Sequence, residues 1–361
     1  MADGAKFPAR RVRTRSSRVT KNASAIKPVN LALQGGGAHG AFTWGVLDRL
    51  CEESRISIEG ISATSAGAMN AAVFVSGLTQ GGRDGARTAL EAYWKRVAKA
   101  GELSPLRPNI FDKLFGFTSP DQSPAFLAFD LMTRILSPYQ FNPLNLNPLR
   151  TVLQQSVDFD ALRRDTCPVK LFLSATNVRT GKVKIFENND ITADAVLASS
   201  CLPFLFQAIE IDGEAYWDGG YMGNPAIFPL IYGCNSHDVV IVHINPIERK
   251  KLPRTASEIM NRINEISFNS SLMREMRAVS FVTKLIDDGK LNDPSFSRML
   301  IHAIADDGMM CSLGVASKMS TDWEFLTGLR DTGRACADAW ITQNFDALGN
   351  CSTVDIGAMY L

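Results

Sequence analysis

Apolar positions follow two patterns that alternate along the chain. Short runs rich in apolar residues, typical of buried strands, occur at 29–34, 56–62, 169–176, 183–186, 207–211, 214–217, 238–245 and 299–305. Between them, a three- to four-residue apolar period predicts helices at 38–53, 68–76, 86–99, 193–200, 256–286 and 321–346. We expect helix 68–76 to end at Gly77. Strands that alternate with helices predict an α/β fold of three layers, a mostly parallel sheet with helices on both faces.

Changes in composition divide the chain into parts. Residues 1–27 contain eight Lys or Arg and one acid, which predicts a basic, disordered arm. Residues 28–246 carry the strand and helix alternation and are expected to form one domain. Within it, 101–146 holds six prolines and six phenylalanines, an insertion that we interpret either as a lid or as a second small core. Residues 247–361 are expected to form a mainly helical extension that packs on this domain.

The overall composition is that of an ordinary globular protein. The chain has 361 residues, of which 45% are apolar and 21% charged. A chain of this length buries about three-quarters of its unfolded surface, so it needs no disulfide or metal to fold, and we expect no metal and no cofactor. The net charge of +1 argues against nucleic acid as a partner.

Cysteine usage and hydropathy indicate where the protein works. The seven cysteines are scattered and form no C-x-x-C pair, which is typical of free thiols in a reducing compartment. No run reaches the ~18 apolar residues of a membrane span, and no secretory signal follows the basic start. We therefore expect a cytoplasmic protein. Residues 7–24, rich in Arg and Ser and free of acids, leave a transit peptide as an alternative, and specialised export leaves no such signal.

A glycine-rich loop joins the first predicted strand to a helix. Gly35–Gly40 reads G-G-G-A-H-G, which exposes backbone N–H groups at a helix start and favours an anion or a developing oxyanion. The same residues satisfy the G-x-G-x-x-G pattern of dinucleotide sites. That pattern needs an acid at the end of the next strand, and the acid there, Glu59, lies inside the strand. Dinucleotide binding is therefore disfavoured.

A second loop, Ala63–Gly67, follows the second strand and reads A-T-S-A-G, similar to the G-x-S-x-G elbow of serine nucleophiles. A nucleophilic serine needs a base. None of the four histidines, at 39, 237, 243 and 302, follows the serine in the loop setting of a triad histidine. The alternative base is an aspartate, and Asp218–Gly220 ends a strand and begins a loop.

These motifs together resemble a patatin-like phospholipase. Gly35–Gly40, Ala63–Gly67 and Asp218–Gly220 occur in the order and spacing of that family, and Ala198–Phe204 is similar to its A-S-x-x-x-P segment beside the active site. The resemblance covers about residues 28–246. It implies a patatin-like fold and the hydrolysis of acyl esters in phospholipids, lysophospholipids or other lipids.

The resemblance also implies roles for individual residues. Ser65 would be the nucleophile and Asp218 its base, a dyad rather than a triad. The backbone N–H groups that would hold the oxyanion are those of Gly36, Gly37 and Ala38. Small residues that would support the three motifs are Gly35, Gly40, Ala63, Gly67, Gly219 and Gly220.

Two departures from the family pattern and several alternatives stay open. His39 replaces the usual Arg or Lys of the glycine motif, and Ala63 replaces the first glycine of the elbow. Intracellular polyhydroxyalkanoate hydrolysis would use the same dyad, and a non-catalytic lipid-binding relative or a toxin-like phospholipase would keep the same scaffold. The expected partner is a lipid or acyl ester. For the apolar stripe at 259–286, we favour core packing over transient contact with a membrane surface. The oligomeric state stays open.

Overall fold

The computed structural model describes residues 26–103, 124–293, 296–314 and 316–361. Its centre is an eight-stranded sheet with the order β5-β6-β3-β2-β1-β7-β8, in which β4 also pairs with β3. The strands are β1 (Lys27–Leu33), β2 (Ile56–Ala63), β3 (Lys170–Asn177), β4 (Val183–Glu187), β5 (Ile209–Ile211), β6 (Glu214–Asp218), β7 (Asp238–Val242) and β8 (Leu300–Ile304).

Most of the sheet is parallel. The strands β3, β2, β1, β7 and β8 run in one direction, while β4, β5 and β6 form the antiparallel part. Two hairpins, β3–β4 and β5–β6, make up this part, and the second turns at Asp212 and Gly213, which both have positive φ. Parallel strands need helical crossovers, which is why the strands of the sequence alternate with helices.

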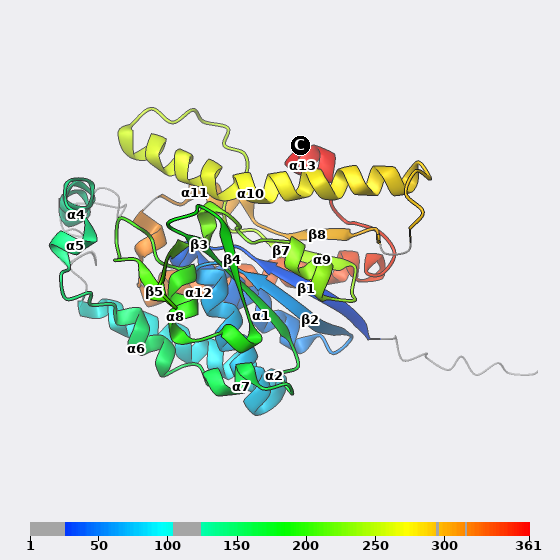
Figure 1. The fold of residues 1–361 in the computed structure, drawn as a ribbon, viewed down its shortest axis with the longest axis horizontal. Coiled ribbons are helices and arrows are strands. Elements are labelled where there is room, and N and C mark those ends of the chain that lie inside the picture. Colours follow the sequence, from blue (N-terminus) through cyan, green and yellow to red (C-terminus); the bar gives the residue numbers. More distant parts are fainter. Residues whose placement is uncertain (1–25, 104–123, 294–295, 315) are drawn as a thin grey trace, which may run out of the picture.

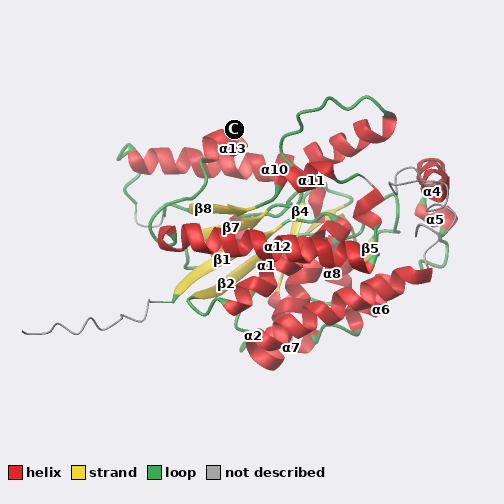
Figure 2. Ribbon diagram, turned by 180° about the vertical axis from the view of Figure 1, so that it is seen from behind, coloured by secondary structure: helices red, strands yellow, loops and turns green. Residues whose placement is uncertain are grey.

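Helices cover both faces of this sheet (Figures 1 and 2). The longer ones are α1 (Gly40–Glu52), α2 (Ala66–Ala100), α4 (Pro124–Ile135), α10 (Ala256–Asp287) and α12 (Trp323–Asn344). The shorter ones are α5 (Pro138–Phe141), α6 (Pro148–Gln154), α7 (Phe159–Arg163), α8 (Ala193–Ser199), α9 (Phe228–Gly233), α11 (Asp307–Ser312) and α13 (Ile356–Tyr360).

Alternate residues of the central strands point into two separate cores. Val240 and Val242 of β7 pack in the larger core with α1, α2 and α12, while Val239 and Ile241 pack in the smaller one with α10 and α13. Such strands are buried on both faces, and they are therefore apolar throughout rather than alternating. The prediction of a three-layer α/β fold is confirmed.

The prediction that helix 68–76 ends at Gly77 is wrong. Helix α2 continues to Ala100, and its break lies at Gly81 and Gly82, whose dihedral angles are not helical. Gly77 is instead a site of close packing, because a Cβ there would lie 2.6 Å from the carbonyl oxygen of Gly85. The glycine therefore allows the second half of α2 to pack against the first.

The C-terminal region joins the same sheet and is mainly helical. Strand β8 pairs with β7, and α12 packs on α1, where a Cβ on Gly45 would lie 1.9 Å from the carbonyl oxygen of Arg330. The division of the chain at residue 246 stays a prediction. In the Phe- and Pro-rich segment 101–146, residues 104–123 lie outside the described part, and α4 and α5 follow them.

Among the helices of the described residues, none combines the length and apolar character needed to cross a bilayer.

Candidate active site

The topology brings the predicted motifs to one end of the sheet. Strands β1 and β2 are parallel neighbours, so the loops that follow them emerge side by side. Strand β3 pairs Leu173 with Ala63 of β2 and Ala175 with Asp218 of β6. Asp218 therefore lies two residues beyond Ala63 along the strand direction, which is the level of Ser65.

Ser65 occupies a strained turn between β2 and α2. Its φ of 55° and ψ of −123° lie where side chains are rarely found. The turn is tight, because a Cβ on Gly35 would lie 2.5 Å from the Ser65 Cβ, and one on Gly67 would lie 2.4 Å from the Leu33 carbonyl oxygen. These two glycines thus allow a serine side chain to project from the start of a helix, as in a nucleophile elbow.

The structure accounts for Ala63 in place of the usual glycine. Ala63 ends strand β2, is fully buried and packs in the larger core, and its φ is not positive. The next residue, Thr64, is held by its hydroxyl, which donates to the carbonyl of Gly223 at 2.6 Å. A methyl group at position 63 is therefore compatible with the turn.

The segment Ala198–Phe204, predicted to pack beside the site, is hydrogen-bonded to both Ser65 and Asp218. The backbone N–H of Ser65 donates to the hydroxyl of Ser199 at 2.9 Å. The N–H of Asp218 donates to the carbonyl of Cys201 at 2.8 Å. The end of α8 and the residues that follow thus fix Ser65 and Asp218 relative to each other.

The carboxyl group of Asp218 is fully buried and only half satisfied. Its Oδ1 accepts a hydrogen bond from the N–H of Gly220 at 2.7 Å, while Oδ2 has no hydrogen-bond partner among the described residues. Burial raises the pKa of Asp218 to about 7, and the Gly220 N–H and the neighbouring Ser65 hydroxyl act in the opposite direction. The Ser65 hydroxyl thus lies close enough to act on the pKa of Asp218.

Two amide side chains form hydrogen bonds with the start of the glycine-rich loop. The N–H of Gly35 donates to Asn224 Oδ1 at 2.7 Å, and the carbonyl of Gly35 accepts from Asn245 Nδ2 at 2.6 Å. The short 3₁₀ helix η1 (Gly37–His39) begins directly after Gly36. The first N–H groups of a helix have no partner within it, so this loop can bind an anion.

The side chain of His39, within the glycine-rich loop, is buried and neutral. Its Nε2 lies 2.7 Å from the hydroxyl of Ser317, which itself donates to the carbonyl of Gly314, so His39 Nε2 is the donor. Burial, with Lys318 and Arg249 nearby, lowers the pKa of His39 to about 3. His39 therefore cannot provide the positive charge of the Arg or Lys usual at this position.

Three groups at this site were not identified as site residues from the sequence: Asn224, Asn245 and Lys318. Asn245 follows a strand whose carboxyl end reaches the ligand-binding edge of a parallel sheet, and this rule would have found it. Asn224 comes six residues after Asp218 in the same loop. Lys318 has no such signal.

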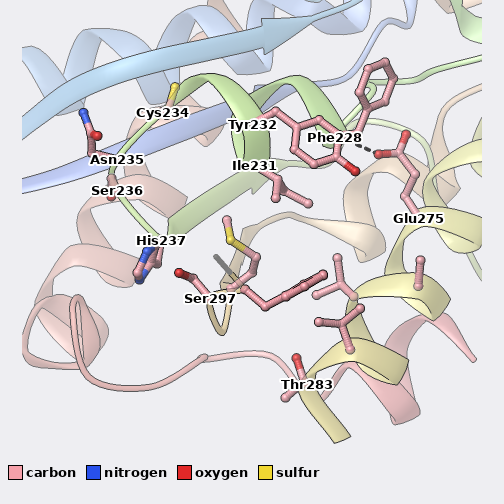
Figure 3. A pocket seen from close by; sticks show the side chains of 15 residues that line it. Phe228, Ile231, Tyr232, Cys234, Asn235, Ser236, His237, Glu275, Thr283 and Ser297 are labelled. Atoms are coloured by element: carbon pink, nitrogen blue, oxygen red, sulfur yellow. Dashed lines mark hydrogen bonds between the residues drawn. The ribbon is translucent and has the colours of Figure 1, made fainter. Parts of the chain in front are cut away.

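A separate cavity of about 710 Å³ lies between α9, α10 and the residues before β7 and β8 (Figure 3). His237 lines this cavity and directly precedes β7. The other end of β7 is hydrogen-bonded to Gln34, which is next to the glycine loop, so the cavity and the loop lie at opposite ends of this strand. Glu275 accepts a hydrogen bond there from the N–H of Phe228 at 2.8 Å. No predicted site residue lines this cavity.

Within the described ranges, no group of three or more His, Cys, Asp or Glu could hold a metal ion.

Comparison with known families identifies the class of protein. The family model described as Patatin-like phospholipase matches residues 31–231, more than half of the chain. The chain therefore belongs to the patatin-like phospholipase family, and this membership supports lipid hydrolysis in general. No curated protein matches the chain significantly.

Solved structures show more distant likeness. VipD from Legionella pneumophila is 17% identical, with a TM-score of 0.42 over 90% of this chain and 68% of that chain. ExoU, in its complex with SpcU from the type III secretion system of Pseudomonas aeruginosa, is 17% identical, with a TM-score of 0.32 over 92% of this chain and 65% of that chain. At these TM-scores the likeness adds nothing to the functional argument.

Proposed function

We propose that this protein is a lipid acyl hydrolase that uses Ser65 as nucleophile and Asp218 as general base. One observation carries the proposal: the strained Ser65 turn lies beside a buried carboxyl group whose Oδ2 has no hydrogen-bond partner among residues that the structure describes. A purely structural serine needs no positive φ, and a purely structural buried carboxylate normally has its hydrogen bonds completed.

The reaction follows from this arrangement. Ser65 Oγ attacks the ester carbonyl carbon, its proton passes to Asp218 Oδ2, and the carbonyl oxygen becomes an oxyanion. The N–H groups of Gly36, Gly37 and Ala38 stabilise that charge. When the C–O bond breaks, the leaving alkoxide takes the proton from Asp218. Water, deprotonated by Asp218, then attacks the acyl-enzyme and releases the fatty acid with Ser65 restored.

A fluorophosphonate probe tests the proposal. We expect a covalent adduct on Ser65, found by peptide mass spectrometry, and its loss in Ser65→Ala and Asp218→Asn. Labelling is measured with detergent or lipid present and absent. If the folded wild-type protein gives no adduct under either condition, the non-catalytic alternative replaces this proposal.

Exposed apolar side chains favour a lipid assembly as the substrate. They lie on α4 and α5 and in the loops that follow these two helices, in the segment after α8, in the loop before α10 and on the first half of α10. Figure 1 shows α4, α5 and the first half of α10 at the end of the molecule toward which the parallel strands point. Their exposed fractions run from 38% to 79%. We call this set the apolar rim: Leu131, Ile135, Leu136, Tyr139, Leu144, Leu146, Phe204, Leu252, Ile259, Met260, Ile263 and Ile266.

The stripe on α10 therefore has two parts. Leu272, Met276 and Val279 pack in the smaller core, as core packing predicts, whereas Ile263 and Ile266 are more than half exposed. Exposed basic residues flank Leu252 in the preceding loop: Lys250, Lys251 and Arg254. Apolar side chains among basic ones suit the surface of an anionic lipid assembly.

Vesicle sedimentation tests this contact. We expect binding to phosphatidylglycerol vesicles that exceeds binding to phosphatidylcholine vesicles, and a loss of binding of about tenfold in Ile263→Glu/Ile266→Glu. Phe281→Glu, exposed at the other end of α10, is the matched control and keeps wild-type binding. Ester hydrolysis of a hydroxybutyrate oligomer without activity on either vesicle would support the polyester alternative instead.

We also propose that the protein acts in a reducing compartment such as the cytoplasm. All seven cysteines are free. A reducing agent should therefore leave the thermal stability unchanged, and a drop in melting temperature on reduction would contradict this placement.

A further inference from the structure

A short C-terminal segment packs directly on the glycine-rich loop. The 3₁₀ helix η6 (Ala316–Met319) follows α11, and a Cβ on Gly37 would lie 2.3 Å from the carbonyl oxygen of Lys318. The preceding residue, Ser317, bonds to His39. Two neighbouring residues of η6 thus contact the segment whose N–H groups are proposed to hold the oxyanion.

A chain of hydrogen bonds connects the Lys318 side chain to this segment. Lys318 Nζ donates to Asn245 Oδ1 at 3.2 Å, and Asn245 Nδ2 donates to the carbonyl of Gly35 at 2.6 Å. That carbonyl and the N–H of Gly36 belong to one peptide unit. Linked hydrogen bonds polarise one another, so a positive charge at the far end makes the Gly36 N–H a stronger donor.

The surroundings of Lys318 act on its pKa in both directions. Burial lowers the pKa, the negative charge of Glu265 raises it, and the positive charge of Arg249 lowers it. The nearby acid, Glu265, is already paired with Arg249 at 2.6 Å and with Arg262 at 3.3 Å. The neutral His39 adds no charge of its own.

We propose that Lys318 is a positioning residue for the glycine-rich loop and supplies, through Asn245 and the Gly35 carbonyl, the positive charge that His39 does not. The inference rests on the proposed hydrolase function. It assigns the region after residue 246 a part in the reaction, since Lys318 belongs to that region.

Steady-state kinetics of Lys318→Met on a soluble ester tests the inference. We expect kcat to fall roughly tenfold, with KM within about twofold, because the loop acts on the oxyanion and not on the bound ester. Lys318→Arg should recover most of kcat, since it keeps the charge. Lys290→Met, which removes an exposed lysine paired with Asp288, is the matched control and keeps wild-type kinetics.

A double-mutant cycle separates this role from simple packing. If Lys318 acts through Asn245, the losses of kcat in Lys318→Met and Asn245→Ala are not additive, and the double variant is about as slow as the slower single one. Melting temperatures are measured on the same samples. Additive losses, or a loss of kcat that only follows a lower melting temperature, would overturn the inference.

The probe distinguishes the two ways of failing. If Ser65 of the wild-type protein is not labelled, the proposed function fails. If it is labelled, and Lys318→Met is labelled and turns over at the wild-type rate, the inference about Lys318 fails while the proposed function stands.

Discussion

Two buried aspartates show how differently the two ends of the sheet are built. Asp238 begins β7 and is 5% exposed, and its Oδ1 accepts hydrogen bonds from His302 Nε2 at 3.0 Å and from the N–H of Gly349 at 2.9 Å. Asp218 ends β6, is 0% exposed and has one oxygen that finds no hydrogen-bond partner in the described part of the chain. The first carboxyl group connects β7 to β8 and to the residues after α12. The second is left open beside Ser65.

The difference indicates which of two equally buried groups is available for chemistry. The Oδ1 of Asp238 is occupied by two structural hydrogen bonds, whereas the Oδ2 of Asp218 has no partner among the described residues and can accept a hydrogen bond from a nucleophile. An unpartnered carboxylate in a low-dielectric site is costly for stability, and such costs are typical of functional sites. His302, the partner of Asp238, also lies within hydrogen-bond distance of Thr353 Oγ1 and is 0% exposed, so this hydrogen-bonded array is closed to solvent at the histidine.

The strongest test compares one substitution at each aspartate. Asp218→Asn should lower ester hydrolysis by about 10³-fold or more, because the amide cannot accept the serine proton. Asp238→Asn should keep kcat per folded molecule, since that group only connects structural elements. Ester hydrolysis per folded molecule is measured for both variants. A comparable loss of kcat in the two would contradict the proposed difference between the two ends of the sheet.

The pH dependence of the reaction gives the next largest effect. Because burial raises the pKa of Asp218 to about 7, kcat/KM should rise roughly tenfold per pH unit below pH 7 and level off above it. Stability should change in the opposite direction. Between pH 4 and 7 the folded state holds a proton that the unfolded state has lost, so this group's contribution to the free energy of unfolding falls as the pH rises.

Asp218→Asn checks that sign. The variant cannot ionise at this position, so its melting temperature relative to the wild type should increase between pH 5 and pH 8. A constant difference over that range would show that the Asp218 carboxyl group is not the buried titrating group described here.

The smallest expected effect comes from the strained turn. Ser65→Gly should be more stable than Ser65→Ala by about 1 kcal/mol, because glycine accepts a positive φ without a steric cost. The corresponding pair at Ser199, which ends a helix, should show no such gain from glycine. Denaturant titration of the four variants measures the difference, and equal stabilities at position 65 would mean that the turn is not strained.

The sequence predicted much of the fold, and it did so where local geometry restricts residue type. Gly35 and Gly67 are visible as motif residues because a Cβ at either would collide with the neighbouring backbone or with Ser65. Gly77 shows the limit of this argument. A glycine often ends a helix, and this rule predicted an end at Gly77. The glycine instead allows close packing with the next helical segment.

The succession of strands and loops along the chain could thus be predicted from the sequence, because tight turns and buried strands leave regular spacings of small and apolar residues. The candidate nucleophile and base came from the resemblance of the motifs to the family. Only the tertiary structure placed Asn224, Asn245 and Lys318 around the glycine-rich loop. Contacts between residues far apart in the chain depend on how helices and strands pack, and they impose no spacing on the sequence. The neutral state of His39 was decided in the same way, by burial and by the charges of Lys318 and Arg249.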